Sequence, residues 1–229
     1  MRGDPDLASI GGALAHPGRA AMLMALLGGE QLTAGQLARY AEISATAASN
    51  HLRRLLELGL VTDERIGRNR LFTLATHDFA DALEALARVA PVKPVRGLRH
   101  SHASEALRRG RTCYDHLAGR LGVGVTDGLL ERAFLTKRRD AFTVTRSGRV
   151  WLAELGIDVE TVAQSKRSFA RICVDWTEQR PHLAGGLGAS LATTFFQRQW
   201  LRRLPGGRAV VLTQRGSEFL ARELGLNAS

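Results

Sequence analysis

The segment from Ser44 to Gly59 constrains the fold of this chain more than any other part of the sequence. Ser44 is a favourable N-cap residue, and Gly59 supplies a stop at the other end. The apolar residues between them repeat with the period of a helix and form one stripe: Ala48, Leu52, Leu55 and Leu56. Short polar residues occupy the other side, which suits a helix that lies against base edges in a major groove. The segment therefore predicts an amphipathic helix that contacts DNA.

Two strand-like runs follow this helix, at residues 60–65 and 70–74, with a hairpin turn at residues 66–69 between them. Three arginines crowd the turn, where their charges can reach phosphates or a minor groove. The pattern indicates double-stranded DNA as a partner. The candidate DNA-binding residues on the helix and beside the turn are Thr46, Ser49, Asn50, His51, Arg53, Arg65, Arg68 and Arg70.

Further helices are expected on both sides of this helix and hairpin. Pro17 fits the first turn of a helix, and Thr33 with Gln36 has the spacing of a capping box. The helices expected in this part of the chain are 7–15, 17–27, 34–40, 45–58 and 77–89. Helices in this order, with a hairpin before the last of them, predict a winged helix-turn-helix over residues 1–90 that binds DNA and dimerises.

Several stretches of these residues resemble the ArsR/SmtB regulators. They are residues 13–19, 37–38, 44–61 and 67–70, within a resemblance that covers about residues 7–90. The resemblance implies a homodimer built from the first and last helices of the domain, and operator DNA bound by the helix that starts at Ser44 with support from the wing. It also implies a repressor that a small inducer releases from DNA.

The metal sites usual in that family are absent from this sequence. Its metal-sensing members carry cysteines in the recognition region, whereas residues 40–43 contain none. The helix expected at residues 77–89 also lacks a paired-histidine and acid pattern for zinc. The resemblance therefore does not identify the inducer, and we assign neither metal ligands nor a cofactor.

The net charge of +10 permits an anionic partner without locating it. Residues 1–90 carry nine arginines against ten acidic residues, whereas residues 91–229 carry 23 basic and 12 acidic residues. Within the first domain the stretch of residues 44–70 is basic, with five arginines and three acids. The DNA assignment therefore depends on motif geometry, and a protein-interaction module that has lost DNA binding stays open as an alternative.

The composition indicates a cytoplasmic protein. No stretch approaches the roughly 20 uninterrupted apolar residues of a membrane span, and the N-terminus lacks the apolar run of a secretory signal. Two cysteines do not make a disulfide scaffold. Because no nucleophile motif, glycine-rich phosphate loop or metal-ligand spacing supports an enzyme, we expect no catalytic residues and no membrane partner.

A linker and a duplicated C-terminal domain follow. Residues 91–100 contain two prolines and a glycine and read as the linker. The C-terminal domain, residues 101–229, is expected to open with a helix at about 101–109 and to hold two internal repeats, at about 111–158 and 171–227. The whole chain is therefore expected to be mainly α with small β-hairpins (α+β), with two repeated winged-helix-like lobes after the winged helix-turn-helix.

Cysteine, aspartate and histidine recur in the two copies, together with a group of aromatic residues. The strand and helix patterns predict that each copy begins with a Cys-bearing helix, followed by a second helix, a strand pair and a closing helix. The candidate sensor residues of the two copies are Cys113, His116, Trp151, Cys173, Trp176 and His182.

Four interpretations of these residues stay open. An aromatic-lined pocket for a small inducer between the lobes is the leading hypothesis for the sensor. The plainest interpretation is that the cysteines are buried apolar residues and that the histidines orient helices. A zinc or cadmium site needs groups from both copies, because Cys113 and Asp115 would point about 200° apart on a helix. A thiol switch between Cys113 and Cys173 requires the fold to bring them together.

Overall fold

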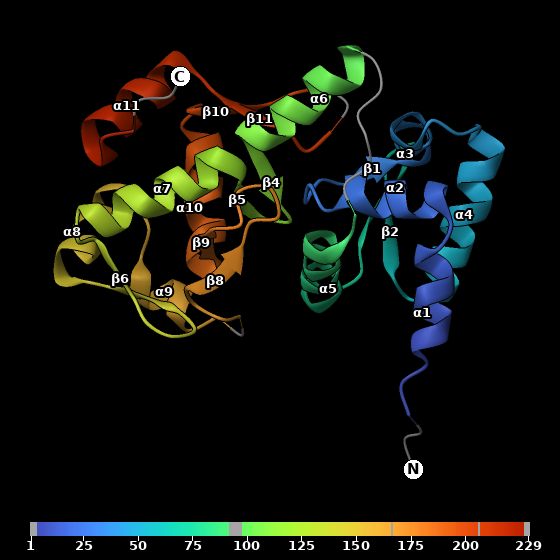
Figure 1. Cartoon of the computed structure of the whole chain (residues 1–229), viewed down its shortest axis with the longest axis horizontal. Helices are drawn as coiled ribbons and strands as arrows, with labels where there is room; N and C mark the ends of the chain where they lie inside the picture. The colour runs from blue at the N-terminus through green and yellow to red at the C-terminus, as the bar shows by residue number, and fades with distance from the viewer. Residues whose placement is uncertain (1–3, 92–97, 166, 206, 227–229) are drawn as a thin grey trace. The chain divides into compact units, whose positions relative to one another are not determined.

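The computed structural model of the chain describes residues 4–91, 98–165, 167–205 and 207–226. The chain divides into two compact units, and Figure 1 labels most of their elements. Unit 1 comprises residues 1–86 with 205–207, and unit 2 comprises residues 87–204 with 208–229.

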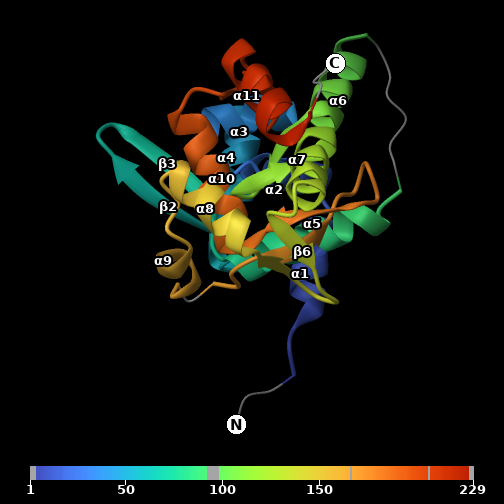
Figure 2. The ribbon, with the colours of Figure 1, turned by 90° about the vertical axis from the view of Figure 1, so that its left-hand side faces the viewer.

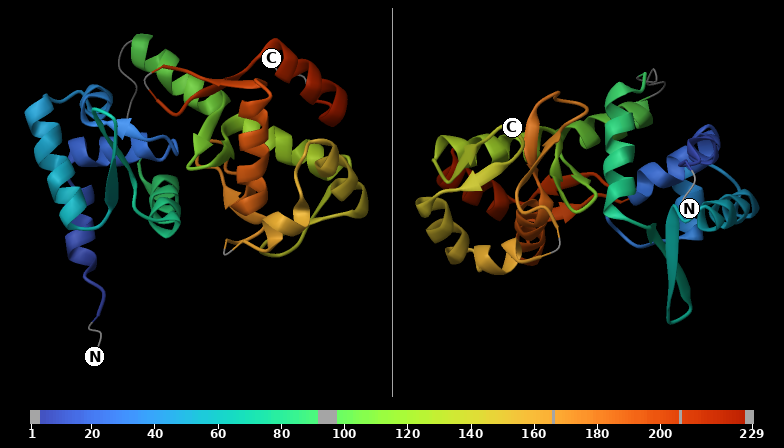
Figure 3. Two further views of the ribbon diagram at one scale, coloured as in Figure 1. Left: turned by 180° about the vertical axis from the view of Figure 1, so that it is seen from behind. Right: turned by 90° about the horizontal axis from the view of Figure 1, so that it is seen from below.

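Unit 1 combines helices with a small antiparallel sheet. Its elements are α1 (Leu7–Leu14), α2 (Pro17–Leu26), β1 (Leu32–Thr33), α3 (Ala34–Ala41), α4 (Ala45–Glu57), β2 (Val61–Ile66), β3 (Asn69–Leu74) and α5 (His77–Val89). The strands lie in the order β1-β3-β2, and the β2–β3 hairpin extends beyond the helices of this unit (Figures 2 and 3). The winged helix-turn-helix expected from the sequence is confirmed, with β1 as an additional short strand.

Local hydrogen bonds determine where α3 and α4 begin. The Thr33 side chain accepts a hydrogen bond from the backbone of Gln36, and the Gln36 side chain accepts one from the backbone of Thr33, which completes the capping box. Ser44 Oγ accepts a hydrogen bond from the N–H of Ala47 at 3.2 Å. Since such caps stabilise a helix by about 1 kcal/mol each, they fix the first turn of α4 and with it the residues that face outward.

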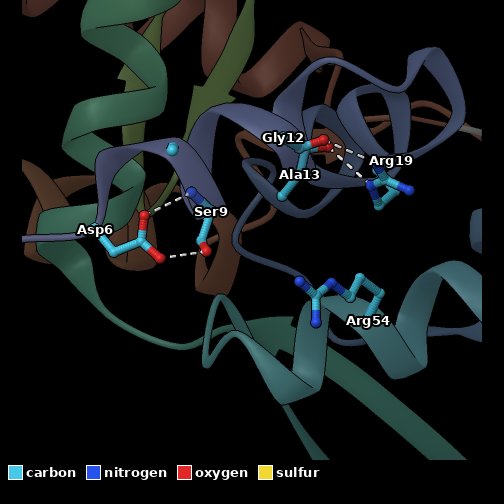
Figure 4. Close-up of a pocket in the computed structure, with 7 residues that line it drawn as sticks. Asp6, Ser9, Gly12, Ala13, Arg19 and Arg54 are labelled. Atoms are coloured by element: carbon cyan, nitrogen blue, oxygen red, sulfur yellow. Dashed lines mark hydrogen bonds between the residues drawn. The ribbon is translucent and has the colours of Figure 1, made fainter.

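The junction between α1 and α2 is also held by side chains. The Nδ1 of His16 caps the N-terminus of α2, whose first residue is Pro17. Arg19 donates hydrogen bonds to the carbonyl oxygens of Gly12 and Ala13, at 2.8 and 2.9 Å (Figure 4). A cation at the C-terminus of a helix satisfies its last carbonyl groups and interacts favourably with its dipole. These bonds tie α1 to α2.

Unit 2 contains one order of elements twice. Its elements are α6 (Leu98–Arg109), β4 (Arg111–Cys113), β5 (His116–Ala118), α7 (Gly119–Glu131), β6 (Leu135–Lys137), β7 (Phe142–Val144), α8 (Arg146–Glu154), α9 (Val159–Ala163), β8 (Arg171–Val174), β9 (Pro181–Ala184), α10 (Gly185–Gln197), β10 (Leu201–Arg203), β11 (Val210–Leu212) and α11 (Gln214–Leu224). The series from β4 to α8 and the series from β8 to α11 each run hairpin, helix, hairpin, helix. The order of elements therefore recurs where the sequence motifs recur.

The long helices of unit 2 pack across these two series. The first-series helix α7 contacts β9 of the second, and the second-series helix α10 contacts β5 of the first. Their apolar side chains join one buried cluster, which includes Leu121, Leu129, Leu187 and Phe195. Burial of a leucine or phenylalanine of this kind contributes about 1.5–3 kcal/mol. Both series therefore contribute to a single shared core.

Two glycines are required where the helices α8 and α11 begin. A Cβ atom at Gly148 would lie 2.0 Å from the carbonyl oxygen of Phe134, and a Cβ at Gly216 would lie 2.1 Å from that of Trp200. Both oxygens belong to backbone, so neither can move aside without a shift of the preceding hairpin. The glycine shared by the two sequence repeats is thus a packing requirement.

The Cys-bearing helices predicted for the two copies are wrong. Cys113 ends β4, and Cys173 lies within β8. Tyr114 and Asp115 form the turn between β4 and β5, with Tyr114 at a φ of 58°. The sequence conceals this turn because it contains no glycine at the positive-φ position. The short runs around the two cysteines form strands because cross-strand pairing is available to them.

The predicted linker at residues 91–100 is described at its two ends. Residues 92–97 of it lie outside the described residues. Helix α6 begins at Leu98 instead of at Ser101, so the last residues assigned to the linker are helical.

Candidate functional site

The polar side of α4 is exposed. Thr46, Ser49, Asn50 and Arg53 are all solvent-exposed, as the sequence predicted. The buried residues of the helix, which pack on α2 and α3, come from the predicted apolar stripe: Ala48, Leu52 and Leu55. The Ser49 hydroxyl donates to the carbonyl oxygen of Ala45 at 3.0 Å, so its own oxygen remains an acceptor toward a ligand.

His51 lies differently from the other candidate residues of α4. It is half-buried, and its ring centroid is 4.2 Å from that of His16 at the start of α2. Burial lowers the pKa of His51, and the nearby charges of His16 and Arg19 lower it further. The ring therefore packs α4 against α2 and supplies little positive charge near neutral pH.

The three hairpin arginines are exposed but are not equivalent. Arg65 and Arg70 stand opposite each other in the β2–β3 ladder. Arg70 donates two hydrogen bonds to the Asp63 carboxylate, at 2.6 and 3.0 Å, and lies 5.2 Å from the centroid of the Phe72 ring. This ion pair offsets the repulsion between opposed arginines. Within the described part of the chain, Arg65 and Arg68 form no ion pair, so their charges remain available to an anion.

Two surface pockets lie in the separate units. One, of about 480 Å³, lies beside α1 and α4 and includes Arg19 and Arg54 (Figure 4). The other, of about 510 Å³, lies in unit 2 along α9 and α10 and includes Arg167. None of the candidate sensor residues lines either pocket.

The two candidate tryptophans occupy packed positions. Trp151 is 5% exposed and stacks on Phe134 with ring centroids 5.1 Å apart. Trp176 is half-buried, and the guanidinium of Arg111 lies 4.6 Å from the centroid of its ring. Trp151 therefore belongs to the shared core, and Trp176 covers a buried cation.

The other four candidate sensor residues meet at one buried point of unit 2. Cys113 stands opposite His116 in the β4–β5 ladder, and Cys173 stands opposite His182 in the β8–β9 ladder. The two Sγ atoms are 4.0 Å apart, and the two Nε2 atoms are 3.1 Å apart. All four side chains are buried, and one nitrogen or sulfur atom from each lies within 4.8 Å of the others. We refer to these four residues as the Cys–His cluster.

A carboxylate stands behind each imidazole of the Cys–His cluster. Asp115 Oδ1 is 3.4 Å from His116 Nδ1, and Asp175 Oδ2 is 3.9 Å from His182 Nδ1. Burial opposes protonation of His116, but hydrogen bonds to Asp115 and Cys173 outweigh it and raise the pKa of His116 to about 8. The hydrogen bond from Cys113 and those from the two histidines lower the pKa of the Cys173 thiol against the effect of burial. The cluster therefore favours a thiolate.

A buried ion pair adjoins the Cys–His cluster. Arg111 and Asp175 are both fully buried, with 2.9 Å between Nη2 and Oδ2. The Asp175 carboxylate also accepts hydrogen bonds from the N–H of Gly119 at 2.6 Å and from the N–H of Thr177 at 2.8 Å. Burial would raise the pKa of Asp175, but the charge of Arg111 and hydrogen bonds from the Thr177 hydroxyl and the N–H of Gly119 hold it well below its usual range. The pair connects β4, the start of α7 and the end of β8.

The sequence analysis did not identify this ion pair, although the repeat contains a signal for it. An arginine stands two residues before the cysteine in both copies, as Arg111 and Arg171. A buried arginine needs a fixed counter-charge, and the aspartate that recurs two residues after each cysteine supplies one. Which arginine pairs with Asp175 depends on the fold.

The described helices include none that is both long and apolar enough to cross a lipid bilayer.

Comparisons with known proteins agree with the architecture of unit 1. The family model "Bacterial regulatory protein, arsR family" matches residues 16–63. Over 213 residues the chain is 39% identical to the uncharacterized HTH-type transcriptional regulator YdfF of Bacillus subtilis, which covers 93% of this chain and 94% of that protein. It is also 36% identical over 62 residues to the HTH-type transcriptional regulator YgaV of Escherichia coli. That match covers 27% of this chain and 63% of YgaV.

Solved structures give a partial match. Reduced HlyU from Vibrio cholerae is 28% identical, with a TM-score of 0.34, and the match covers 38% of this chain and 90% of that one. The likeness to YdfF, by contrast, extends over both units.

Proposed function

This chain belongs to the ArsR family of bacterial regulatory proteins, and on that premise we propose that it is a homodimeric repressor that binds operator DNA through α4 and the β2–β3 hairpin. It is a transcriptional regulator with a DNA-binding helix-turn-helix. The observation that carries the finer proposal is the exposed polar side of α4. The repressor acts in the cytoplasm, where its operator lies.

Base reading is assigned to the N-terminal half of α4. Ser49 and Asn50 are short enough to let the helix backbone approach the groove, and an asparagine amide can form two hydrogen bonds with adenine. Thr46 lies one turn before Asn50, on the same exposed side. Arg65 and Arg68 supply the phosphate or minor-groove contacts, while Arg70 is engaged by Asp63.

Dimerisation is assigned to α1 and α5. Large apolar side chains that are exposed lie on both helices: Leu7 is 76% exposed, Leu86 47% and Val89 80%. Apolar residues that gather on two helices gain free energy when a second copy covers them. A dimer presents two copies of α4 to two operator half-sites.

Release from DNA is assigned to a small inducer sensed by unit 2. Unit 2 has its own buried core, so it is a folded unit and not an unstructured C-terminal extension. The residues that carry the DNA-binding motif all belong to unit 1. An inducer that binds unit 2 more tightly when the chain is off DNA must, by linkage, weaken DNA binding by the same factor.

The test compares binding to DNA from the promoter of the gene itself with binding to scrambled DNA, by fluorescence anisotropy at near-physiological salt. We expect the wild-type chain to bind promoter DNA about 10³-fold or more tightly than scrambled DNA. Asn50→Ala changes the preferred base at one position, by about 1–3 kcal/mol. Arg68→Ala weakens binding to both DNAs alike and reduces the salt slope by about 1.

The matched control is Arg180→Ala, which removes an exposed arginine from unit 2 and is expected to leave promoter affinity unchanged. An equal loss on both DNAs from Asn50→Ala would remove Asn50 from base reading. Equal binding of promoter and scrambled DNA by the wild-type chain would overturn the proposed function.

A further inference from the structure

We propose that the Cys–His cluster of unit 2 binds one zinc ion, which clamps the two series of elements together. The four ligands are Cys113 and His116 from the first hairpin and Cys173 and His182 from the second. The proposal concerns unit 2 alone and does not depend on the proposed DNA binding.

The distances within the cluster fit a tetrahedral ion. With Zn–S bonds of about 2.3 Å and Zn–N bonds of about 2.0–2.1 Å, a tetrahedral site places its sulfurs about 3.8 Å apart and its nitrogens about 3.3 Å apart. The two Sγ atoms are 4.0 Å apart and the two Nε2 atoms are 3.1 Å apart. The S–S and N–N distances are close to these values, whereas the sulfur–nitrogen separations reach 4.8 Å against about 3.6 Å in a tetrahedral site, so an ion draws the cysteine and histidine pairs together by up to about 1 Å.

The contact between the two imidazoles calls for a cation. His116 Nδ1 lies within hydrogen-bond reach of Asp115 Oδ1, at 3.4 Å, whereas His182 Nδ1 is 3.9 Å from Asp175 Oδ2 and has no hydrogen-bond partner among the described residues. The two Nε2 atoms face each other across 3.1 Å, so in the metal-free chain a proton on one of them must bridge the pair, and a metal ion can take the place of that proton. A metal ion between them bonds to both nitrogens, and Asp115 then lies behind the His116 ligand as carboxylates do in known zinc sites.

Charge balance allows the ion to be buried. Two thiolates and two neutral imidazoles carry a charge that one divalent zinc ion cancels. Burial of an uncompensated charge is costly, whereas a neutral set of ligands and ion avoids most of that cost. Two sulfur and two nitrogen ligands select zinc over calcium and magnesium, which take oxygen ligands.

The site is closed in the manner of a structural zinc site. All four ligands are at most 8% exposed, and none of them lines either of the surface pockets described above. Catalytic zinc sites instead keep one position open for water or substrate. Because each hairpin supplies one cysteine and one histidine, the ion joins elements that are far apart in the sequence.

The experiment measures metal in the purified full-length chain. Elemental analysis is expected to find one zinc ion per chain, and Cys173→Ser is expected to lose nearly all of it. His102→Ala, which alters an exposed histidine of the same unit, is the matched control and is expected to retain the zinc. Cobalt(II) added to the chelator-treated wild-type chain should give the visible d–d bands of a tetrahedral site and a thiolate-to-cobalt charge-transfer band.

A measurement on the wild-type chain covers the case in which Cys173→Ser does not fold. The reaction of the native chain with a thiol reagent is expected to be slow until a strong chelator is added, and then to modify both cysteines. The proposal is overturned if the wild-type chain holds no zinc and gives no charge-transfer band with cobalt. It is also overturned if the purified chain has lost two hydrogens to a Cys113–Cys173 disulfide, a result that favours a thiol switch.

Discussion

Substitution of Asp175 by asparagine tests the role of the buried ion pair. The change keeps the size of the side chain, so it creates no cavity, but it removes the negative charge beside Arg111. Both partners are fully buried in the native chain, and the guanidinium of Arg111 remains charged at any ordinary pH. Asp175→Asn therefore removes the carboxylate that pairs with a buried cation.

The expected cost follows from this burial. Removal of one partner from a buried ion pair costs about 3–5 kcal/mol. Urea unfolding of a small domain has an m value of about 2 kcal/mol per molar, so the unfolding midpoint should fall by roughly 1.5–2.5 M. The weaker hydrogen bond to the N–H of Gly119 acts in the same direction.

Tryptophan fluorescence is the assay, because all three tryptophans of the chain lie in unit 2. Asp127→Asn is the matched control. The distance from Arg180 Nη2 to Asp127 Oδ2 is also 2.9 Å, but the side chain of Arg180 is 58% exposed and that of Asp127 is 31% exposed. Exposed pairs of this kind contribute about 0–1 kcal/mol. Equal midpoint shifts in the two variants would refute the argument from burial, and zinc analysis of the same samples separates loss of the pair from loss of metal.

Two other predictions concern packing and assembly. Gly216→Ala places a Cβ 2.1 Å from the carbonyl oxygen of Trp200 and should destabilise unit 2 by at least about 1–3 kcal/mol; an unchanged urea midpoint contradicts the packing requirement. Val89→Glu should convert the dimer to a monomer in sedimentation experiments, because Val89 is 80% exposed on α5. Val150→Glu, at a 60% exposed position in unit 2, is the control and should leave the mass of the dimer unchanged. A monomeric wild-type chain would contradict the proposed dimer.

The parts of the fold that could be predicted depend on residues that are close together in the sequence. The start of α4 depends on Ser44 and the N–H of Ala47, three residues apart. The capping box of α3 has the same span. The exposed side of α4 follows from the helical period alone. His51 deviates because a residue distant in sequence, His16, covers its ring.

The parts that could not be predicted depend on pairing between distant strands. The expectation that a metal site would need groups from both copies was argued from a helix around Cys113, but Cys113 lies in a strand, and the helix assignment hid its cross-strand pairing with His116. The contact between Cys113 and Cys173 spans 60 residues. The pair of Arg111 with Asp175 spans 64 residues. Such contacts depend on how the two hairpins meet, which no local pattern encodes.

The packing of α7 on β9 and of α10 on β5 has a consequence for synthesis. When the ribosome has made the chain only as far as α8, α7 can pack on α6, β5 and β6, but the part of its apolar side that β9 covers in the folded unit is still exposed. The nascent segment then lacks part of the shared core and is less stable than the finished unit. Contacts of such long sequence separation also slow folding. Unit 2 should therefore acquire protease resistance in one step, after its second half has emerged.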